Sequence, residues 1–163
     1  MPELIIIRGN SGSGKTTLAR NLQRRFGRNT MVISQDVVRR DILMERDGVD
    51  TKALPLLIEL LKYGRQNCEV VILEGILNAE WYKTLFETAI LEYGSNIHAY
   101  YYDIPFEETV KRHKTKPNCN DFGEDDMRRW WNEKDYIRII HEVTFTSEIS
   151  LEKAAELIYK FQF

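Results

Sequence analysis

The chain has little cysteine, no strong excess of one charge and no long apolar run, and each of these absences excludes a class of protein. Cys68 and Cys119 show no disulfide or metal spacing, so we expect free thiols in a reducing compartment. The net charge of −2 argues against a general binder of nucleic acid. No apolar run approaches the roughly 20 residues that span a bilayer, and the N-terminus lacks a signal-peptide pattern. We therefore expect a cytoplasmic protein with no membrane segment.

The length and the order of the predicted elements favour a single α/β domain. A chain of 163 residues suits one hydrophobic core, and we take 1–163 as one domain. Strand-like apolar runs end near positions 9, 35, 75, 103 and 146, and helical patterns separate them, among them 37–46 and a helix that Gly64 ends. This alternation is typical of a parallel sheet with helices on both faces. We expect three layers around a five-stranded parallel sheet.

The segment GNSGSGKT directly follows the first predicted strand and matches the phosphate-loop pattern G-x-x-x-x-G-K-[ST] at each fixed position. Gly12 and Gly14 let the loop curl so that its N–H groups converge on phosphate oxygens. The N-terminus of the next helix adds a partial positive charge. We expect Lys15 to reach the β- and γ-phosphates of ATP and the Thr16 hydroxyl to ligate Mg²⁺. The candidate nucleotide-binding residues are Gly9, Asn10, Ser11, Gly12, Ser13, Gly14, Lys15, Thr16 and Thr17, of which Thr17 either contacts a phosphate or only occupies the first helical turn.

The loop and the short chain favour a compact phosphotransferase with a three-layer P-loop NTPase fold. A motor or a large ATPase needs more chain to couple hydrolysis to movement. The letters NEKD at 132–135 stand in the wrong order for the guanine-reading motif. The letters DFG at 121–123 stand without the other protein-kinase motifs. Neither short match therefore changes the prediction.

A candidate general base follows the second predicted strand. Asp36 stands just past the end of that strand, and the carboxyl ends of neighbouring parallel strands line one crevice. A carboxylate there can orient an acceptor hydroxyl and take its proton. Arg39 and Arg40 follow on the same turns and suit an anionic or polar acceptor. The alternative is that Asp36 only caps the helix it begins, with the arginines in solvent.

Two further segments, taken with the loop, resemble a known group of enzymes. GNSGSGKTT followed by ISQDVVRRD is similar to the P-loop kinases related to polynucleotide kinase, the zeta-toxin kinases and chloramphenicol phosphotransferase. The resemblance implies that Asp36 activates the acceptor hydroxyl. The later DIPFEETVKRHKTKP and FGEDDMRRWW resemble the basic lid of this group, here about 111–129. The resemblance assigns Arg112 to a catalytic, ATP-binding lid position and gives Lys114 or Lys116 as its partner.

The third predicted strand, VVILEG, brings an acid to the edge of the expected site. Glu74 ends this strand, and the arrangement resembles a Walker B acid that holds Mg²⁺ through water or meets the acceptor. The alternative is a strand-end carboxylate that only accepts hydrogen bonds from nearby N–H groups.

These residues predict a kinase that moves the γ-phosphoryl group of ATP, with Mg²⁺, to a hydroxyl of a small molecule such as a nucleoside, a sugar or an antibiotic. Two alternatives remain open at this point. One is a kinase of the 5′-hydroxyl of a nucleic acid, against which the net charge argues. The other is a switch or adaptor that binds ATP without an acceptor, which would need no acidic base opposite the γ-phosphate.

Overall fold

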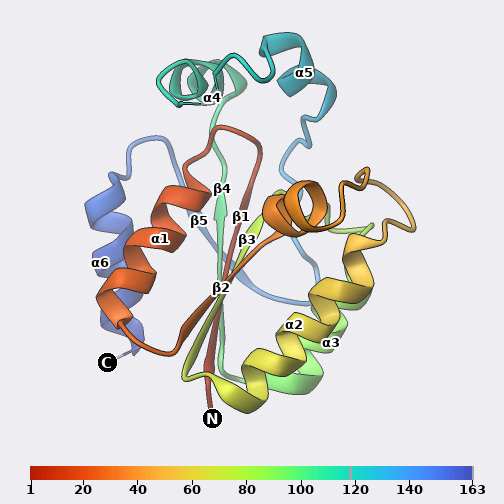
Figure 1. Ribbon diagram of the computed structural model, residues 1–163. Helices are drawn as coiled ribbons and strands as arrows, with labels where there is room; N and C mark the ends of the chain where they lie inside the picture. Colours follow the sequence, from red (N-terminus) through yellow and green to blue (C-terminus); the bar gives the residue numbers. More distant parts are fainter. Residues whose placement is uncertain (118, 163) are drawn as a thin grey trace.

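Five parallel strands form the central layer of the protein, in the order β2-β3-β1-β4-β5 (Figure 1). The structure is a computed structural model that describes residues 1–117 and 119–162. The strands are β1 (Glu3–Gly9), β2 (Thr30–Ser34), β3 (Val70–Gly75), β4 (Ile97–Tyr102) and β5 (Glu142–Phe145). The predicted five-stranded parallel sheet is confirmed. Its central strand, β1, leads directly into the phosphate loop.

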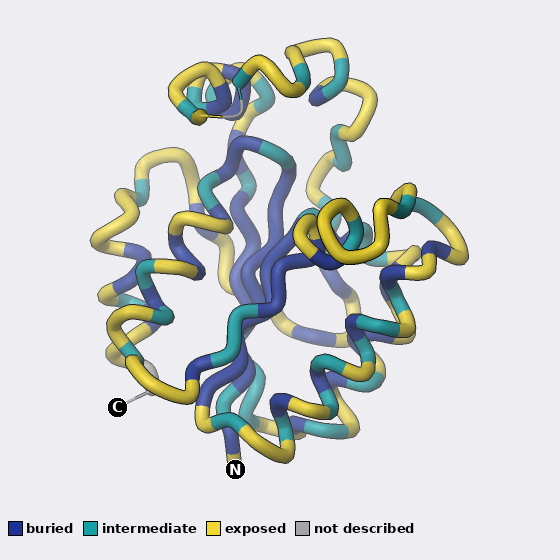
Figure 2. The backbone as a smooth tube through the Cα atoms, viewed as in Figure 1, coloured by how far each residue is buried: buried dark blue, intermediate teal, exposed yellow. Residues whose placement is uncertain are grey.

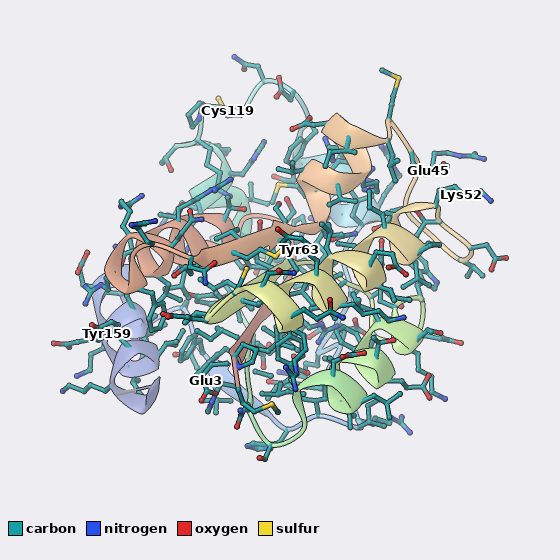
Figure 3. The ribbon with its side chains drawn as sticks, turned by 60° about the horizontal axis from the view of Figure 1, so that its bottom comes forward. Glu3, Glu45, Lys52, Tyr63, Cys119 and Tyr159 are labelled. Atoms are coloured by element: carbon teal, nitrogen blue, oxygen red, sulfur yellow. The ribbon has the colours of Figure 1, made fainter. Side chains whose placement is uncertain are left out.

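Helices form the two outer layers. Along the chain they are α1 (Lys15–Phe26), the π-helix η1 (Val37–Ile42), α2 (Ala53–Asn67), α3 (Lys83–Tyr93), α4 (Phe106–His113), α5 (Glu124–Arg129) and α6 (Leu151–Gln162). Helices α1 and α6 cover one face of the sheet, and α2 and α3 cover the other (Figure 1). Figure 3 labels Tyr63 on α2 and Tyr159 on α6, which lie well apart in the two layers. Among the described residues, each helix is too short or too polar to span a bilayer.

The core consists of two apolar layers, one on each face of the sheet. Successive side chains of a strand point to opposite faces. Leu4 and Ile6 of β1 therefore join the layer under α2 and α3, while Ile5 and Ile7 join the layer under α1 and α6. Figure 2 shows the strands buried along most of their length and the outer surfaces of the helices exposed. Burial on both faces explains why the strands are continuous apolar runs.

Two predicted helix bounds were wrong. The helix expected over 37–46 is the short η1, because the chain turns away after Ile42 and Met44 has a positive φ of 49°. Gly64 does not end α2, which continues to Asn67. A Cβ atom at Gly64 would lie 2.6 Å from Cγ2 of Val71, so the glycine allows the helix to approach the sheet closely.

A buried arginine ties the segments around the site to the central strand. The Arg8 guanidinium is fully buried and donates hydrogen bonds to both carboxylate oxygens of Glu142, at 3.1 and 2.9 Å. It also donates to Asp135, at 2.8 Å, and to the Leu77 carbonyl, at 2.9 Å. Loss of one partner from such a buried cluster costs about 3–5 kcal/mol of stability, because a charge is left unpaired. Arg8 thereby holds β5, the segment after the lid and the loop after β3 next to the phosphate loop.

Candidate active site

The phosphate loop has a backbone that requires glycine at two of its positions. Gly12 has a φ of +84°, and a Cβ atom there would lie 2.5 Å from the Thr109 carbonyl oxygen of α4. Gly14 has a φ of +101° and directly precedes the first turn of α1. Both conformations are costly for residues that carry a Cβ. The loop is therefore curled as expected, and α4 lies against it.

Lys15 lies inside the curled loop. Its Nζ donates to the Asn10 carbonyl oxygen at 2.9 Å and to Oγ of Ser13 at 3.3 Å. Only 8% of the residue is exposed. Burial lowers the pKa of Lys15 to about 8, although the nearby Glu74 carboxylate acts in the opposite direction. The ammonium group is thus held where the loop amides converge.

Thr16 and Glu74, the two candidate magnesium ligands, contact each other. The Thr16 hydroxyl donates to Oε2 of Glu74 at 3.1 Å. Glu74 is buried and pairs in register with Ile7 of β1, which brings it beside the loop. Mg²⁺ in proteins commonly uses one or two protein oxygens together with phosphate oxygens and water. This hydroxyl–carboxylate pair fits such a site, and the described residues contain no group of three or more His, Cys, Asp or Glu that could hold a metal alone.

Asp36, Arg39 and Arg40 form one cluster at the end of β2. The Asp36 carboxylate pairs with Arg39 at 3.2 Å and with Arg40 at 3.6 Å. Asp36 makes no capping hydrogen bond, whereas Oγ of Ser34 accepts one from the Val37 N–H. The alternative in which Asp36 only caps the helix was therefore wrong. Its side chain is 61% exposed, so an acceptor hydroxyl can reach it.

The predicted lid lies over the loop as α4, α5 and their connection, of which position 118 is outside the described residues (Figure 1). The Arg112 guanidinium donates to the Ser13 carbonyl at 2.9 Å and to the Ser147 carbonyl at 3.3 Å. Lys116 is half-buried, and burial lowers its pKa while the nearby Glu74 carboxylate raises it. Lys114 is exposed. Of the two candidate lysines, the structure therefore brings Lys116 toward the site.

Two cavities border the phosphate loop and share no lining residue. One, of about 420 Å³, is lined by Ser13, Gly14, Thr17, Tyr102, Arg112 and the turn 147–151 before and into α6. The other, of about 390 Å³, is lined by Ser11, Asp36, Arg39, Arg40 and several arginine and aromatic side chains. A larger cavity of about 550 Å³ lies between the start of α3 and residues 133–139, and no phosphate-loop residue lines it. We name the cavity with Thr17 the nucleotide side and the cavity with Ser11 the acceptor side, after the roles proposed for them.

Several residues of the site were missed by sequence reasoning. The turn 147–151 lines the nucleotide side, and Asn132 binds the loop. The Asn10 side chain donates to the Asn132 carbonyl at 2.7 Å and accepts from the Asn132 N–H at 2.8 Å. Asn10 thus joins the loop to the segment after the lid, a contact that no local pattern announces. Arg8 was detectable, because a charged residue in an apolar strand demands buried partners.

Comparison with known proteins places the chain in a family. The family described as AAA domain (AAA_33) matches residues 4–136. Among solved structures, the chain is similar to the Mycobacterium tuberculosis APS kinase CysC in complex with AMPPNP and APS (TM-score 0.68, 17% identity, covering 99% of this chain and 97% of that one). It is also similar to the Deinococcus radiodurans tunicamycin resistance protein (TM-score 0.65, 16% identity, covering 99% of this chain and 96% of that one). A third similar structure is a gluconokinase from Sinorhizobium meliloti 1021 (TM-score 0.59, 16% identity, covering 99% of this chain and 98% of that one).

No curated protein matches the sequence. The structural similarities, all below 25% identity, confirm the three-layer P-loop fold. The match of the family covers most of the chain and confirms the resemblance to P-loop kinases. The chain therefore belongs to the AAA domain family, as a small P-loop kinase domain.

Proposed function

We propose that the protein transfers the γ-phosphoryl group of ATP to a hydroxyl group of a small molecule. The observation that carries this proposal is that two separate cavities, with no lining residue in common, both border one phosphate loop. Arg112 lines the cavity of about 420 Å³, and Asp36 lines the cavity of about 390 Å³. A phosphoryl group held by the loop would lie between a nucleotide and an acceptor, which is the arrangement that in-line transfer needs.

On the nucleotide side, the loop amides and Lys15 bind the β- and γ-phosphates, and the Arg112 guanidinium exchanges its backbone acceptors for phosphate oxygens. Thr17 and the turn 147–151 contact the rest of the nucleotide. Thr16 and Glu74 would hold Mg²⁺, which neutralises phosphate charge when bound. Lys116 adds a second lid cation above the same group. The contacts in the free protein are compatible with these roles, since each cation already points at a loop oxygen or lies close to Glu74.

On the acceptor side, the Asp36 carboxylate accepts the proton of the acceptor hydroxyl as its oxygen attacks the γ-phosphorus. A new oxygen–phosphorus bond forms while the bond from the γ-phosphorus to the β–γ bridging oxygen breaks. The products are a phosphate monoester and ADP, and Asp36 returns its proton to solvent. Arg39 and Arg40, which already pair with Asp36, orient the acceptor. Glu74 is the other carboxylate in the same electrostatic neighbourhood, because both acids act on Lys15.

The acceptor-side cavity also separates this proposal from its alternatives. A switch or adaptor needs no second cavity with an exposed carboxylate beside the loop. A volume of about 390 Å³ is within the range typical of small-molecule sites. The net charge of −2 argues against a protein whose whole surface binds nucleic acid.

The test is product analysis with γ-labelled ATP and Mg²⁺ over nucleosides, nucleotides, sugars, aminoglycosides, chloramphenicol-like alcohols and 5′-hydroxyl oligonucleotides. We expect label in an acid-stable monoester of one acceptor class, and none with the Lys15→Met variant. Release of inorganic phosphate alone, with no labelled acceptor anywhere in the panel, would support an ATPase or switch instead. Labelling confined to oligonucleotides would support the nucleic-acid kinase.

A further inference from the structure

The acceptor-side cavity has a composition that narrows the acceptor further. Its cationic lining consists of four arginines, Arg39, Arg40, Arg46 and Arg129, against two acids, Asp36 and Asp47. The cavity thus carries an excess of positive charge in a protein whose net charge is −2. A neutral sugar or alcohol would not need this excess, whereas an anionic group would form charge-assisted hydrogen bonds with it.

Two of these arginines keep unused donors. Nε of Arg39 is buried without a hydrogen-bond partner. The Arg46 guanidinium makes no hydrogen bond or ion pair with the described residues, although it lines the cavity. Arg40 and Arg129 already pair with Asp36 and Asp126. The buried Nε–H of Arg39 is costly without an acceptor, and the exposed Arg46 guanidinium is free to bind one, so a ligand with several acceptor oxygens would use both.

The same cavity is rich in aromatic rings. All three tryptophans of the chain, Trp81, Trp130 and Trp131, line it together with Phe122. Trp81 and Trp130 expose 37% and 36% of their surface. The Arg40 guanidinium lies 5.7 Å from the Trp130 ring centroid and 5.9 Å from that of Phe122. A cation and aromatic rings are therefore close together in the cavity lining.

Packing of the lid onto the body explains only part of this lining. Trp131 does pack, with its ring edge-on to Phe106 at 5.3 Å and its Nε1 bonded to Glu133. Trp81 belongs to the body, in the turn before α3, and lines the same cavity as Arg129 of α5. The unused donors of Arg39 and Arg46 have no role in such packing. A bound planar ring with an anionic group accounts for both features.

We infer that the acceptor is a free nucleotide: a planar base stacks on the tryptophan-lined wall, a phosphate ester lies among the arginines, and a free sugar hydroxyl faces Asp36. This inference rests on the proposed phosphotransfer. The hydroxyl oxygen of the nucleotide gains the γ-phosphoryl group of ATP, its proton passes to Asp36, and ADP leaves. A cavity of about 390 Å³ suits one nucleotide rather than a polymer.

Binding is tested first, on the full chain with saturating ADP and Mg²⁺, so that the phosphate loop is occupied and only the acceptor side is free. The probes for calorimetric titration are the 3′- and 5′-monophosphates of the four ribonucleosides, the parent nucleosides, ribose 5-phosphate and a 5′-hydroxyl oligonucleotide. We expect at least one monophosphate to bind about 10- to 100-fold more tightly than its nucleoside and than ribose 5-phosphate. Because all three tryptophans line this cavity, binding of the monophosphate should also change the intrinsic tryptophan fluorescence of the protein.

Variants separate the two parts of the recognition. Arg46→Gln should weaken binding of the monophosphate by about tenfold and leave binding of the nucleoside unchanged, since one charge-assisted contact is lost. Trp81→Leu should weaken binding of both the monophosphate and the nucleoside but not binding of ribose 5-phosphate, since stacking of the base is lost. Arg24→Gln, an exposed arginine of α1 outside the cavity, is the matched control and should change nothing.

The outcomes distinguish this inference from the kinase proposal. Equal affinity for nucleoside and monophosphate, no binding of any monophosphate, or binding of the oligonucleotide alone would each overturn the nucleotide acceptor. Monophosphate binding that Arg46→Gln does not weaken would overturn the assignment to this cavity. If the monophosphate binds as expected but receives no label from ATP, its recognition by this cavity stands and its assignment as the acceptor is overturned; the phosphotransfer proposal fails only if no acceptor of the whole panel is labelled. Lys15→Met should retain this binding while losing transfer.

Discussion

On the proposed nucleotide side of the phosphate loop the cations donate mainly to backbone oxygens, whereas on the proposed acceptor side they pair mainly with carboxylates. Lys15 and Arg112 donate to carbonyl groups of the loop itself. Arg39 and Arg40 converge instead on one exposed carboxylate, Asp36. Backbone acceptors persist whatever side chains the loop carries. Loop conformation therefore positions the cations on the nucleotide side, whereas particular carboxylate side chains position those on the acceptor side.

The largest expected effect comes from Asp36→Asn, which tests the acceptor side alone. The amide cannot accept the hydroxyl proton, and general-base catalysis contributes about 10²–10⁴ in rate, so transfer should fall by about that factor. ATP affinity and the melting temperature should stay unchanged, because Asp36 lines the acceptor cavity and is exposed. The measurements are labelled-phosphate transfer, calorimetric ATP binding and thermal unfolding. Full activity of the variant would contradict the assignment of Asp36 as the general base and would make Glu74 the next candidate for that role.

Lys15→Met tests the nucleotide side. Removal of a preorganised positive group from the transferring phosphate typically costs about 10²–10³ in rate. The protein should remain folded, because burial of Lys15 is unfavourable for its charge and methionine removes that cost. Transfer rates and circular dichroism of the purified variant provide the check. A rate close to that of the unmodified protein would show that the loop is not the catalytic phosphate site.

A smaller effect should distinguish the two lid lysines. Lys116→Gln removes the half-buried cation near Glu74, and we expect transfer to fall by about tenfold, the equivalent of one modest electrostatic contact. Lys114→Gln is the matched control, two residues away and exposed. Both variants change the net charge equally. A similar loss of rate in the two would mean that the lid acts through its total charge and not through a specific contact.

The smallest expected effect concerns proton uptake on ATP binding. In the free protein, burial lowers the pKa of Lys15 to about 8, against the opposing effect of Glu74. Bound phosphates favour the charged ammonium, so the pKa in the complex lies higher. Above pH 8, binding of ATP therefore takes up a fraction of a proton at Lys15, and the affinity for ATP falls as the pH rises further. Titration calorimetry above pH 8 in two buffers of different ionisation enthalpy measures the uptake, which Lys15→Met should abolish.

The sequence predicted the conformation around the phosphate loop better than that of the segment after β2. The strand, loop and first helix were placed correctly, since glycine spacing and apolar runs are local features. Lys15 and Thr16 were named from the phosphate-loop pattern, Asp36 and Glu74 from their places at strand ends, and Arg112 from the resemblance of the lid segment. The fold class followed from the alternation of strand and helix patterns. The short η1 and the continuation of α2 beyond Gly64 were missed, because both depend on packing against other segments.

By itself, the sequence determined that this chain forms a parallel sheet around a phosphate loop, because hydrophobic periodicity and glycine positions act over a few residues. Only the tertiary structure decided which lysine of the lid faces the site, that Asn132 binds the loop, and that three tryptophans share a cavity with four arginines. These contacts join residues up to 122 positions apart. Their partners are chosen when the sheet and lid pack together, since desolvation and hydrogen bonding then favour one arrangement of distant side chains.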